Sequence, residues 1–160
     1  MLNTLIEVTE LFKKNHVSYC LIGGLAVMLY HGRANTVDMD FYVMVDDLKK
    51  VKELFEENNY TVRDAGEYQL KTKIKGTPID ILFADPYMGE AVVKRAAQKP
   101  LGKHFVRVAT PEDLIILKTI ADRSVDRRDI EELREIFGKS LDEAYIQKKL
   151  KYIDKLLKSP

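Results

Sequence analysis

The sequence predicts an α/β (α+β) fold in which helices flank a mixed, mostly antiparallel sheet and the C-terminal third is helical. Helix and strand signals alternate up to Ala109, and only helical periodicity follows it. A chain of 160 residues with 46% hydrophobic content can bury one ordinary core. We therefore expect a core over residues 1–109 and a helical extension over 110–160 that packs on it as a single compact unit.

Composition excludes several classes of partner. Lys and Arg total 26 against 25 Asp and Glu, so a net charge of +1 gives no global field for DNA or a membrane surface. The longest apolar stretch, 21–30, is far below the roughly 20 residues of a membrane span. Residues 1–14 lack the features of a signal peptide, and the single Cys20 cannot form an internal disulfide. We expect a cytoplasmic protein with Cys20 in its core.

The first elements follow from hydrophobic periodicity. Apolar residues recur at helical spacing near the start of the chain, as Leu2, Leu5, Ile6 and Phe12. The run at 17–22 then predicts a short buried strand, and 25–31 predicts a helix after two glycines. Asp46 and Asp47 are typical caps for a helix that ends near Asn58.

A hairpin and a terminal helical region complete the plan. Residues 68–76 alternate as a half-exposed strand does, and Gly76, Thr77 and Pro78 predict a turn into a strand at 79–85. A helix over 87–98 and a strand over 104–109 follow. Thr110 with Pro111 marks a helix start, and Ser140 with Glu143 predicts a capping box for the last helix.

Two acidic residues interrupt an otherwise buried strand. Asp38 and Asp40 are two apart, so they point to one face roughly 6.6 Å apart along it, whereas Met39 points into the core. Two carboxylates on one face repel each other and resist burial unless something neutralises them. A divalent cation does so, and Mg²⁺ suits carboxylate and phosphate oxygens. The pair therefore predicts phosphate chemistry.

Gly23 and Gly24 end a strand where a helix begins. Such a turn presents unpaired backbone N–H groups, which bind anions. The thirteen residues from 25 to 37 allow one helix and a return that brings the carboxylates beside the glycines. Turn and carboxylates can then hold one triphosphate.

Asp80 is a third acid, placed between Ile79 and Ile81 on another strand. Three convergent carboxylates could hold two metal ions about 4 Å apart, one for the leaving phosphates and one for the attacking oxygen. Asp80 could also accept the proton of an acceptor hydroxyl.

This combination, "IGG", a spacer, "DMDF" and a later "IDI", resembles the DNA polymerase β-like nucleotidyltransferase superfamily. The resemblance implies a mixed sheet with up to two Mg²⁺ ions, for which Mn²⁺ can substitute, and transfer of a nucleoside monophosphate from NTP, ATP included, to a hydroxyl. Gly23 and Gly24 would bind phosphate, and Asp38, Asp40 and Asp80 would be the catalytic metal ligands. Residues 1–109 would be the catalytic core.

A second resemblance, to the small prokaryotic abortive-infection-type branch, covers residues 112–133. Lys118, Arg123, Asp126 and Asp129 match its pattern, and Lys118 would reach the triphosphate. Smaller relatives often have Arg-x-Thr-x-Asp before the first metal ligand. Here Thr36 keeps its place and Arg33 stands three before it, so both are phosphate-binding candidates. Gly24 occupies a position where the superfamily often has serine.

Each feature also has a plainer interpretation. The glycines alone could form a tight turn, Asp38 and Asp40 could face water, and Asp80 could be a paired acid. Lys118 could extend its ammonium to the surface, and Asp126 and Asp129 could be acids at a helix start. His31 could border the site.

Three functions remain open. The first is Mg²⁺-dependent nucleotide transfer to an RNA end, a protein side chain or a small molecule. The second is a catalytically silent, antitoxin-like binding module that acts through a toxin–antitoxin partner. The third is a metal-dependent glycosyltransferase, since Asp-x-Asp also binds Mn²⁺ with a sugar nucleotide. The glycine turn and Asp80 argue against the third.

Overall fold

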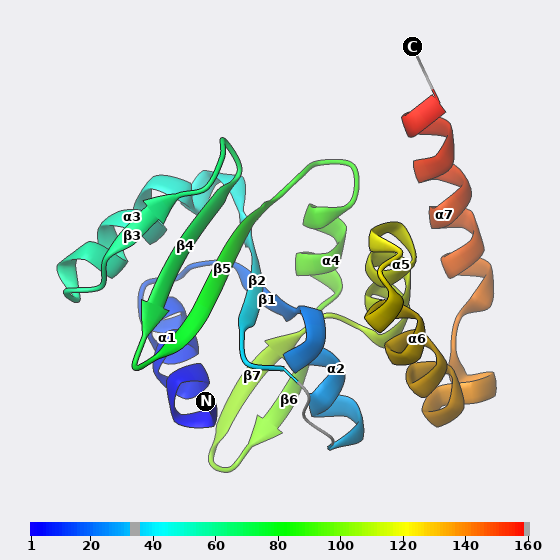
Figure 1. The fold of residues 1–160 in the computed structure, drawn as a ribbon, viewed down its shortest axis with the longest axis horizontal. Helices are drawn as coiled ribbons and strands as arrows, with labels where there is room; N and C mark the ends of the chain where they lie inside the picture. The colour runs from blue at the N-terminus through cyan, green and yellow to red at the C-terminus, as the bar shows by residue number, and fades with distance from the viewer. Residues whose placement is uncertain (33–35, 159–160) are drawn as a thin grey trace.

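The computed structural model describes residues 1–32 and 36–158 and has a seven-stranded sheet at its centre (Figure 1). The strand order is β3-β4-β5-β2-β1-β7-β6. The strands are β1 Tyr19–Ile22, β2 Met39–Met44, β3 Val62–Asp64, β4 Gln69–Ile74, β5 Thr77–Ala84, β6 Ala97–Leu101 and β7 His104–Val108. β1 and β7 run parallel, as do β2 and β5, whereas the other four pairings are antiparallel. The predicted mixed, mostly antiparallel sheet is confirmed.

Helices lie on the sheet and beyond one end of it (Figure 1). They are α1 Leu2–Lys14, α2 Gly23–His31, α3 Leu48–Glu57, α4 Gly89–Arg95, α5 Pro111–Ala121, α6 Ser124–Phe137 and α7 Glu143–Lys158. Two short 3₁₀ turns, η1 Val45–Asp47 and η2 Gly138–Ser140, connect elements. No helix in the described part of the chain is long and apolar enough to cross a membrane.

One face of the sheet is closed by aromatic packing. Phe12 of α1 contacts Tyr19, Phe41 and Phe55, with ring centroids 5.2, 5.5 and 5.7 Å away. Phe41 is fully buried, as are its neighbours on the same face of β2, Met39 and Val43. Because side chains alternate along a strand, Asp40 points to the opposite face. The functional candidates therefore lie on the face away from α1 and α3.

The hairpin of β4 and β5 has a two-residue turn. Lys75 and Gly76 both have positive φ, 49° and 83°, as a type I′ turn requires. This turn sets the register in which Lys71 lies opposite Asp80. The predicted turn at Gly76–Pro78 was placed too late, because Thr77 already belongs to β5.

Two predicted local features are wrong. The helix expected over 87–98 spans only 89–95, since Ala97 and Gln98 belong to β6, an edge strand that tolerates Pro100. Within residues 36–158, Ser140 and Glu143 do not form the expected capping box. The carboxylate of Asp142 instead accepts the N–H of Tyr145, and the Ser140 hydroxyl donates to the Phe137 carbonyl.

The helices after Ala109 are tied to the rest of the molecule through Asp113. This fully buried carboxylate accepts bonds from Arg95 of α4, from Thr110 and from the hydroxyl of Tyr145 in α7. The predicted Thr110 cap is confirmed, since its hydroxyl accepts the N–H of Asp113 at 3.2 Å. The division near residue 109 stays a prediction.

Candidate active site

A cavity of about 900 Å³ opens between the sheet and helices α5 and α6. Every predicted site residue in the described part of the chain lines it, namely Gly23, Gly24, Thr36, Asp38, Asp40, Asp80 and Lys118. Arg33 lies outside the described residues. The volume is typical of pockets that bind small-molecule ligands.

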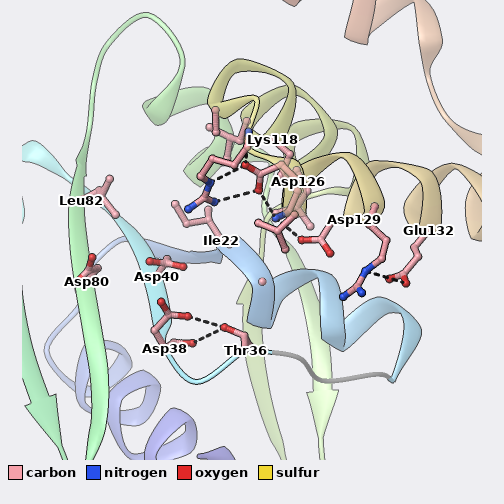
Figure 2. A pocket seen from close by; sticks show the side chains of 18 of the residues that line it. Ile22, Thr36, Asp38, Asp40, Asp80, Leu82, Lys118, Asp126, Asp129 and Glu132 are labelled. Carbon is pink, nitrogen blue, oxygen red and sulfur yellow. Dashed lines mark hydrogen bonds and ion pairs between the residues drawn. The ribbon is translucent and has the colours of Figure 1, made fainter.

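The sheet wall carries the three predicted carboxylates (Figure 2). β2 and β5 run parallel, and Asp40 and Asp80 are register partners, so their side chains leave the same face of neighbouring strands. Asp38 stands just before β2 and is exposed. Residues that are 40 positions apart in the sequence thus share one wall.

Asp40 has an unfavourable electrostatic environment. Burial raises its pKa to about 6, and the neighbouring charges of Asp38 and Asp80 contribute to that rise, whereas Arg123 and Lys118 oppose it. Charge repulsion among these carboxylates is what a bound cation relieves.

The glycine turn fits against Asp40. Gly23 follows β1 with a φ of +71°, and a Cβ built on it would lie 2.1 Å from Asp40 Oδ2. Any larger residue would be strained by the positive φ and would have to displace the Asp40 side chain. The turn begins α2, whose first backbone N–H groups have no partner within the helix, and both Gly23 and Gly24 line the cavity.

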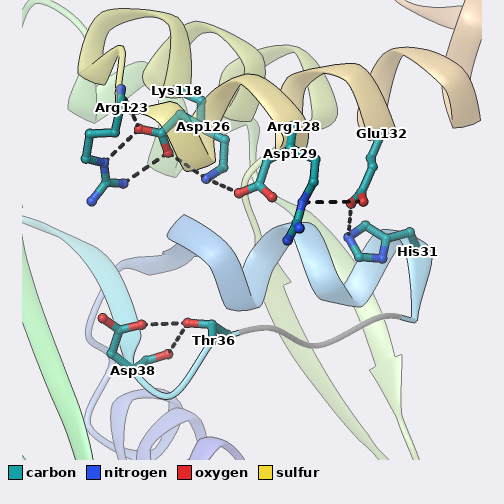
Figure 3. Close-up of polar contacts among 9 residues, drawn as sticks. All are labelled: His31, Thr36, Asp38, Lys118, Arg123, Asp126, Arg128, Asp129 and Glu132. Carbon is teal, nitrogen blue, oxygen red and sulfur yellow. Dashed lines mark hydrogen bonds and ion pairs between the residues drawn. The ribbon is translucent and has the colours of Figure 1, made fainter.

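Thr36 holds Asp38 beside that turn. Its hydroxyl donates to Asp38 Oδ1 at 2.6 Å (Figure 3). Thr36 also packs against Gly24, since a Cβ on Gly24 would lie 3.1 Å from the Thr36 Cβ and 3.2 Å from its hydroxyl oxygen. Thr36 therefore fills the space beside the position that is often serine in the superfamily.

The opposite wall is an ion-pair network between α5 and α6 (Figure 3). Lys118, 5% exposed, places its ammonium 3.1 Å from Asp126 Oδ1 and 2.5 Å from Asp129 Oδ2. Arg123 binds both carboxylate oxygens of Asp126, at 2.7 and 3.1 Å. Lys118 faces the cavity but does not extend to the surface, and Asp126 and Asp129 are its partners rather than only acids at a helix start.

Asp126 is buried yet remains suited to carry a charge. Burial raises its pKa, but the bonds from Arg123 and Lys118 outweigh that effect and lower the pKa below its ordinary value. The cationic side chains of this wall are thus neutralised by acids of α6. A phosphate ligand would compete with these acids for Lys118 and Arg123.

Sequence reasoning missed two residues of β4 that contact Asp80, of which Gln69 also lines the cavity. Gln69 and Lys71 of β4 both contact Asp80 Oδ2, each at 3.1 Å. Their alternation with buried Leu70 and Thr72 indicates that they share the more exposed face of a strand. Contact with Asp80 follows only from the register between β4 and β5. The expectation that His31 borders the site is confirmed, since it lines the cavity and pairs with Glu132 at 3.1 Å.

The carboxylates of Asp38 and Asp40 fit a hard divalent cation by their donor chemistry, and burial together with charge repulsion raises the Asp40 pKa, which a bound cation would counteract. Asp80 is a less direct candidate because β4 already occupies one of its oxygens. Among the described residues, no group of three or more His, Cys, Asp and Glu side chains converges as a ready-made metal site. A pair of ligands fits better than a preformed triad.

A model of the family "Nucleotidyl transferase of unknown function (DUF2204)" matches residues 1–157. No curated protein matches the chain.

Solved structures show the same fold at low sequence identity. ANT(2″)-Ia in complex with adenylyl-2″-tobramycin has a TM-score of 0.70 and 13% identity, covering 97% of this chain and 98% of its own. The lincosamide antibiotic adenylyltransferase LnuA, lincomycin-bound, has a TM-score of 0.65 and 19% identity over 82% and 95% of the two chains. An antigenic nucleotidyltransferase-like protein of Paracoccidioides brasiliensis has a TM-score of 0.62 and 18% identity over 96% and 87%. The predicted nucleotidyltransferase fold is confirmed.

Proposed function

The chain belongs to the nucleotidyl transferase family DUF2204, and we propose that it transfers a nucleoside monophosphate from an NTP to a hydroxyl acceptor and releases pyrophosphate. This proposal depends on one observation, which is that carboxylates line one wall of the cavity and cationic side chains line the other. Asp40 and Asp80 lie in register on one wall, and Lys118 with Arg123 lies on the other. Carboxylates for a metal and cations for phosphates are the groups that phosphoryl transfer requires.

The triphosphate is assigned to the space between these walls. The N–H groups of Gly23 and Gly24 donate to phosphate oxygens at the start of α2. Lys118 and Arg123 turn from Asp126 to the phosphates, because a triphosphate brings more negative charge than the carboxylates they leave. The Thr36 hydroxyl orients Asp38 at the same edge.

Asp38 and Asp40 would hold Mg²⁺, which neutralises phosphate charge when bound. Asp80 then accepts the proton of the acceptor hydroxyl. The acceptor oxygen bonds to the α-phosphorus, the bond from that phosphorus to its bridging oxygen breaks, and pyrophosphate leaves with the electron pair.

The acceptor is an RNA end, a protein side chain or a small hydroxylated molecule. Two solved relatives of the fold carry names that include tobramycin and lincomycin. This supports the small molecule among the three. We place the reaction in the cytoplasm, where the fully buried thiol of Cys20 stays reduced.

One observation favours a second candidate, a silent module that acts through a toxin–antitoxin partner. Lys118 is paired with two acids, and Asp80 with Lys71. A site whose charges are satisfied internally gains less from binding a triphosphate. Stable co-purification of a partner protein without NTP turnover would support this candidate.

The deciding experiment is calorimetric binding of each of the four NTPs with Mg²⁺, on wild type and on Asp38→Asn/Asp40→Asn. We expect metal-dependent binding that the double variant loses. The matched control is Asp46→Asn/Asp154→Asn, which removes two exposed carboxylates elsewhere. Absence of binding by folded wild type would overturn the proposed transfer and leave the silent module.

A further inference from the structure

We propose that the site binds one divalent cation rather than two, because Lys71 supplies beside Asp80 the positive charge that a second ion would bring. The inference rests on the proposed function. It concerns Asp80, whose role the sequence left open between a ligand of a second metal ion and an acceptor of the substrate proton.

The geometry around Asp80 is set by strand pairing. Lys71 is its register partner on β4, and the Lys71 ammonium lies 3.1 Å from Asp80 Oδ2. Gln69, two residues earlier on the same face of β4, donates its amide N–H to that same oxygen at 3.1 Å. One oxygen of Asp80 is therefore shared by a cation and a neutral donor.

The Lys71 ammonium lies against the carboxylate that would have to bind a second ion. A lysine ammonium is a compact point charge, and at this distance from a carboxylate it neutralises much of the charge that would attract a metal. A divalent ion that bound Asp80 would have to displace Lys71 or accept a like charge beside it. The Lys71 side chain is 43% exposed and the Asp80 side chain 27% exposed, so solvent screens this ion pair in part, and a second ion has to compete with the ammonium for the same carboxylate.

The three predicted ligands are also divided between different partners. Asp38 is held by Thr36, and Asp80 is held by Gln69 and Lys71, whereas Asp40 lies against the Gly23 turn. This division explains why no group of three potential ligands converges in the described part of the molecule. Two-metal sites need carboxylates that bridge ions about 4 Å apart. The arrangement matches one ion on Asp38 and Asp40.

Asp80 is then left with the proton-accepting role. Gln69 and Lys71 both use its Oδ2, so the contacts with β4 leave Oδ1 available to a substrate. The acceptor hydroxyl gives its proton to Oδ1 as its oxygen bonds to the α-phosphorus. Lys71 and Gln69 are positioning residues in this scheme because they act through Asp80.

The test counts Mn²⁺ ions bound per chain by equilibrium dialysis, with a non-hydrolysable ATP analogue present at saturation. We expect one ion in wild type and two in Lys71→Met, which removes the ammonium and keeps the length of the stem. Lys71→Arg keeps the charge and should bind one. The matched control Lys73→Met removes an exposed lysine of the same strand that pairs with Pro78, and it should also bind one.

The outcomes separate the inference from the proposed function. Two ions in wild type would overturn the inference and leave nucleotide transfer standing. One ion in both wild type and folded Lys71→Met would overturn the role of Lys71. No ion in wild type would overturn the proposed function and the inference together. Circular dichroism of each variant confirms that the folded protein is being counted.

Discussion

Gly23 and Asp40 fit one another so closely that a single added carbon atom would separate them, since a Cβ on Gly23 would lie 2.1 Å from Asp40 Oδ2. The phosphate-binding turn and the carboxylate wall are therefore one structural unit. β1 and β2 pair antiparallel with Ile22 opposite Asp40, so the residue that follows β1 must pass beside this carboxylate. A substitution at Gly23 should therefore displace the Asp40 carboxylate, and a substitution at Asp40 should alter the turn at Gly23.

We expect Gly23→Ala to destabilise the protein and abolish NTP binding. A positive φ costs alanine about 1–2 kcal/mol, and displacing Asp40 should add about 1–3 kcal/mol. Gly32→Ala is the matched control, because Gly32 has a φ of +77° and an added Cβ there would meet no atom within 4 Å. Urea denaturation measures both. If the free energy of unfolding falls equally in the two variants, Asp40 does not restrict residue 23.

Asp40→Asn should stabilise the fold while it removes metal binding. Burial and the charges of Asp38 and Asp80 raise the Asp40 pKa to about 6 from an ordinary value of 3.8. Ionisation therefore weakens the native state as pH rises through about 4 to 6. Well above pH 6, ionised Asp40 lowers the free energy of unfolding of wild type by roughly 2–3 kcal/mol, and the variant does not have this loss.

Denaturation at pH 4 and pH 8, with EDTA present, checks this sign. The variant should be more stable than wild type at pH 8 and nearly equal at pH 4. Asp38→Asn should change stability less, because Asp38 is exposed and already bonded by Thr36. If Asp40→Asn is more stable than wild type by the same amount at both pH values, the electrostatic explanation is contradicted.

Lys118→Met should destabilise the protein by about 3 kcal/mol, because it leaves the buried Asp126 and the partly buried Asp129 of α6 with less compensation. Restoring neutrality with Lys118→Met/Asp129→Asn should recover part of the loss. The comparison variant is Lys158→Met, whose partner Asp154 lies with it on the exposed surface, and it should have no measurable effect. A loss in Lys118→Met no larger than that of Lys158→Met would mean that the network does not hold α5 to α6.

Gly24→Ser, which introduces the residue common in the superfamily, should cost about 1 kcal/mol because Thr36 occupies the adjacent space. Thr36→Ala removes two of the three nearest atoms, the hydroxyl oxygen at 3.2 Å and Cγ2 at 3.7 Å. The cost of Gly24→Ser should then fall by at least about 0.5 kcal/mol in the Thr36→Ala background. A double-mutant cycle by thermal denaturation measures this coupling. Strict additivity would show that the two side chains do not compete.

The sheet wall was predictable because charge breaks a simple periodicity there. Asp38, Asp40 and Asp80 interrupt apolar alternation, and alternation fixes which face each side chain takes. Lys71 and Gln69 were not predictable in the same way. Their contact with Asp80 depends on a turn at Lys75 and Gly76 that sets the register, and a shift of one residue would move them to the other face.

Two further differences have similar causes. The partners of Lys118 lie on the next helix, 8 and 11 residues further along the chain, beyond a break at Asp122 with a φ of +45°. Periodicity within one helix carries no information about such a pairing. β6 was missed because Ala97 and Gln98 continue a helical composition, and only pairing with β7 makes them a strand.

The last prediction concerns the division near residue 109. Asp113 is fully buried and bonded to Arg95 in α4 and to Tyr145 in α7, so residues on both sides of the division share one carboxylate. We expect the chain to unfold in one transition, with coincident circular dichroism and tyrosine fluorescence. Tyr145→Phe should lower the free energy of unfolding by about 1–2 kcal/mol, because it leaves a buried acceptor unpaired, and it should shift the whole transition. Tyr152→Phe, on the exposed side of α7, is the control and should change nothing. Two separate transitions in wild type would show that residues 110–160 unfold independently of the sheet, and the carboxylate of Asp113 would then have to be satisfied within the helical part alone.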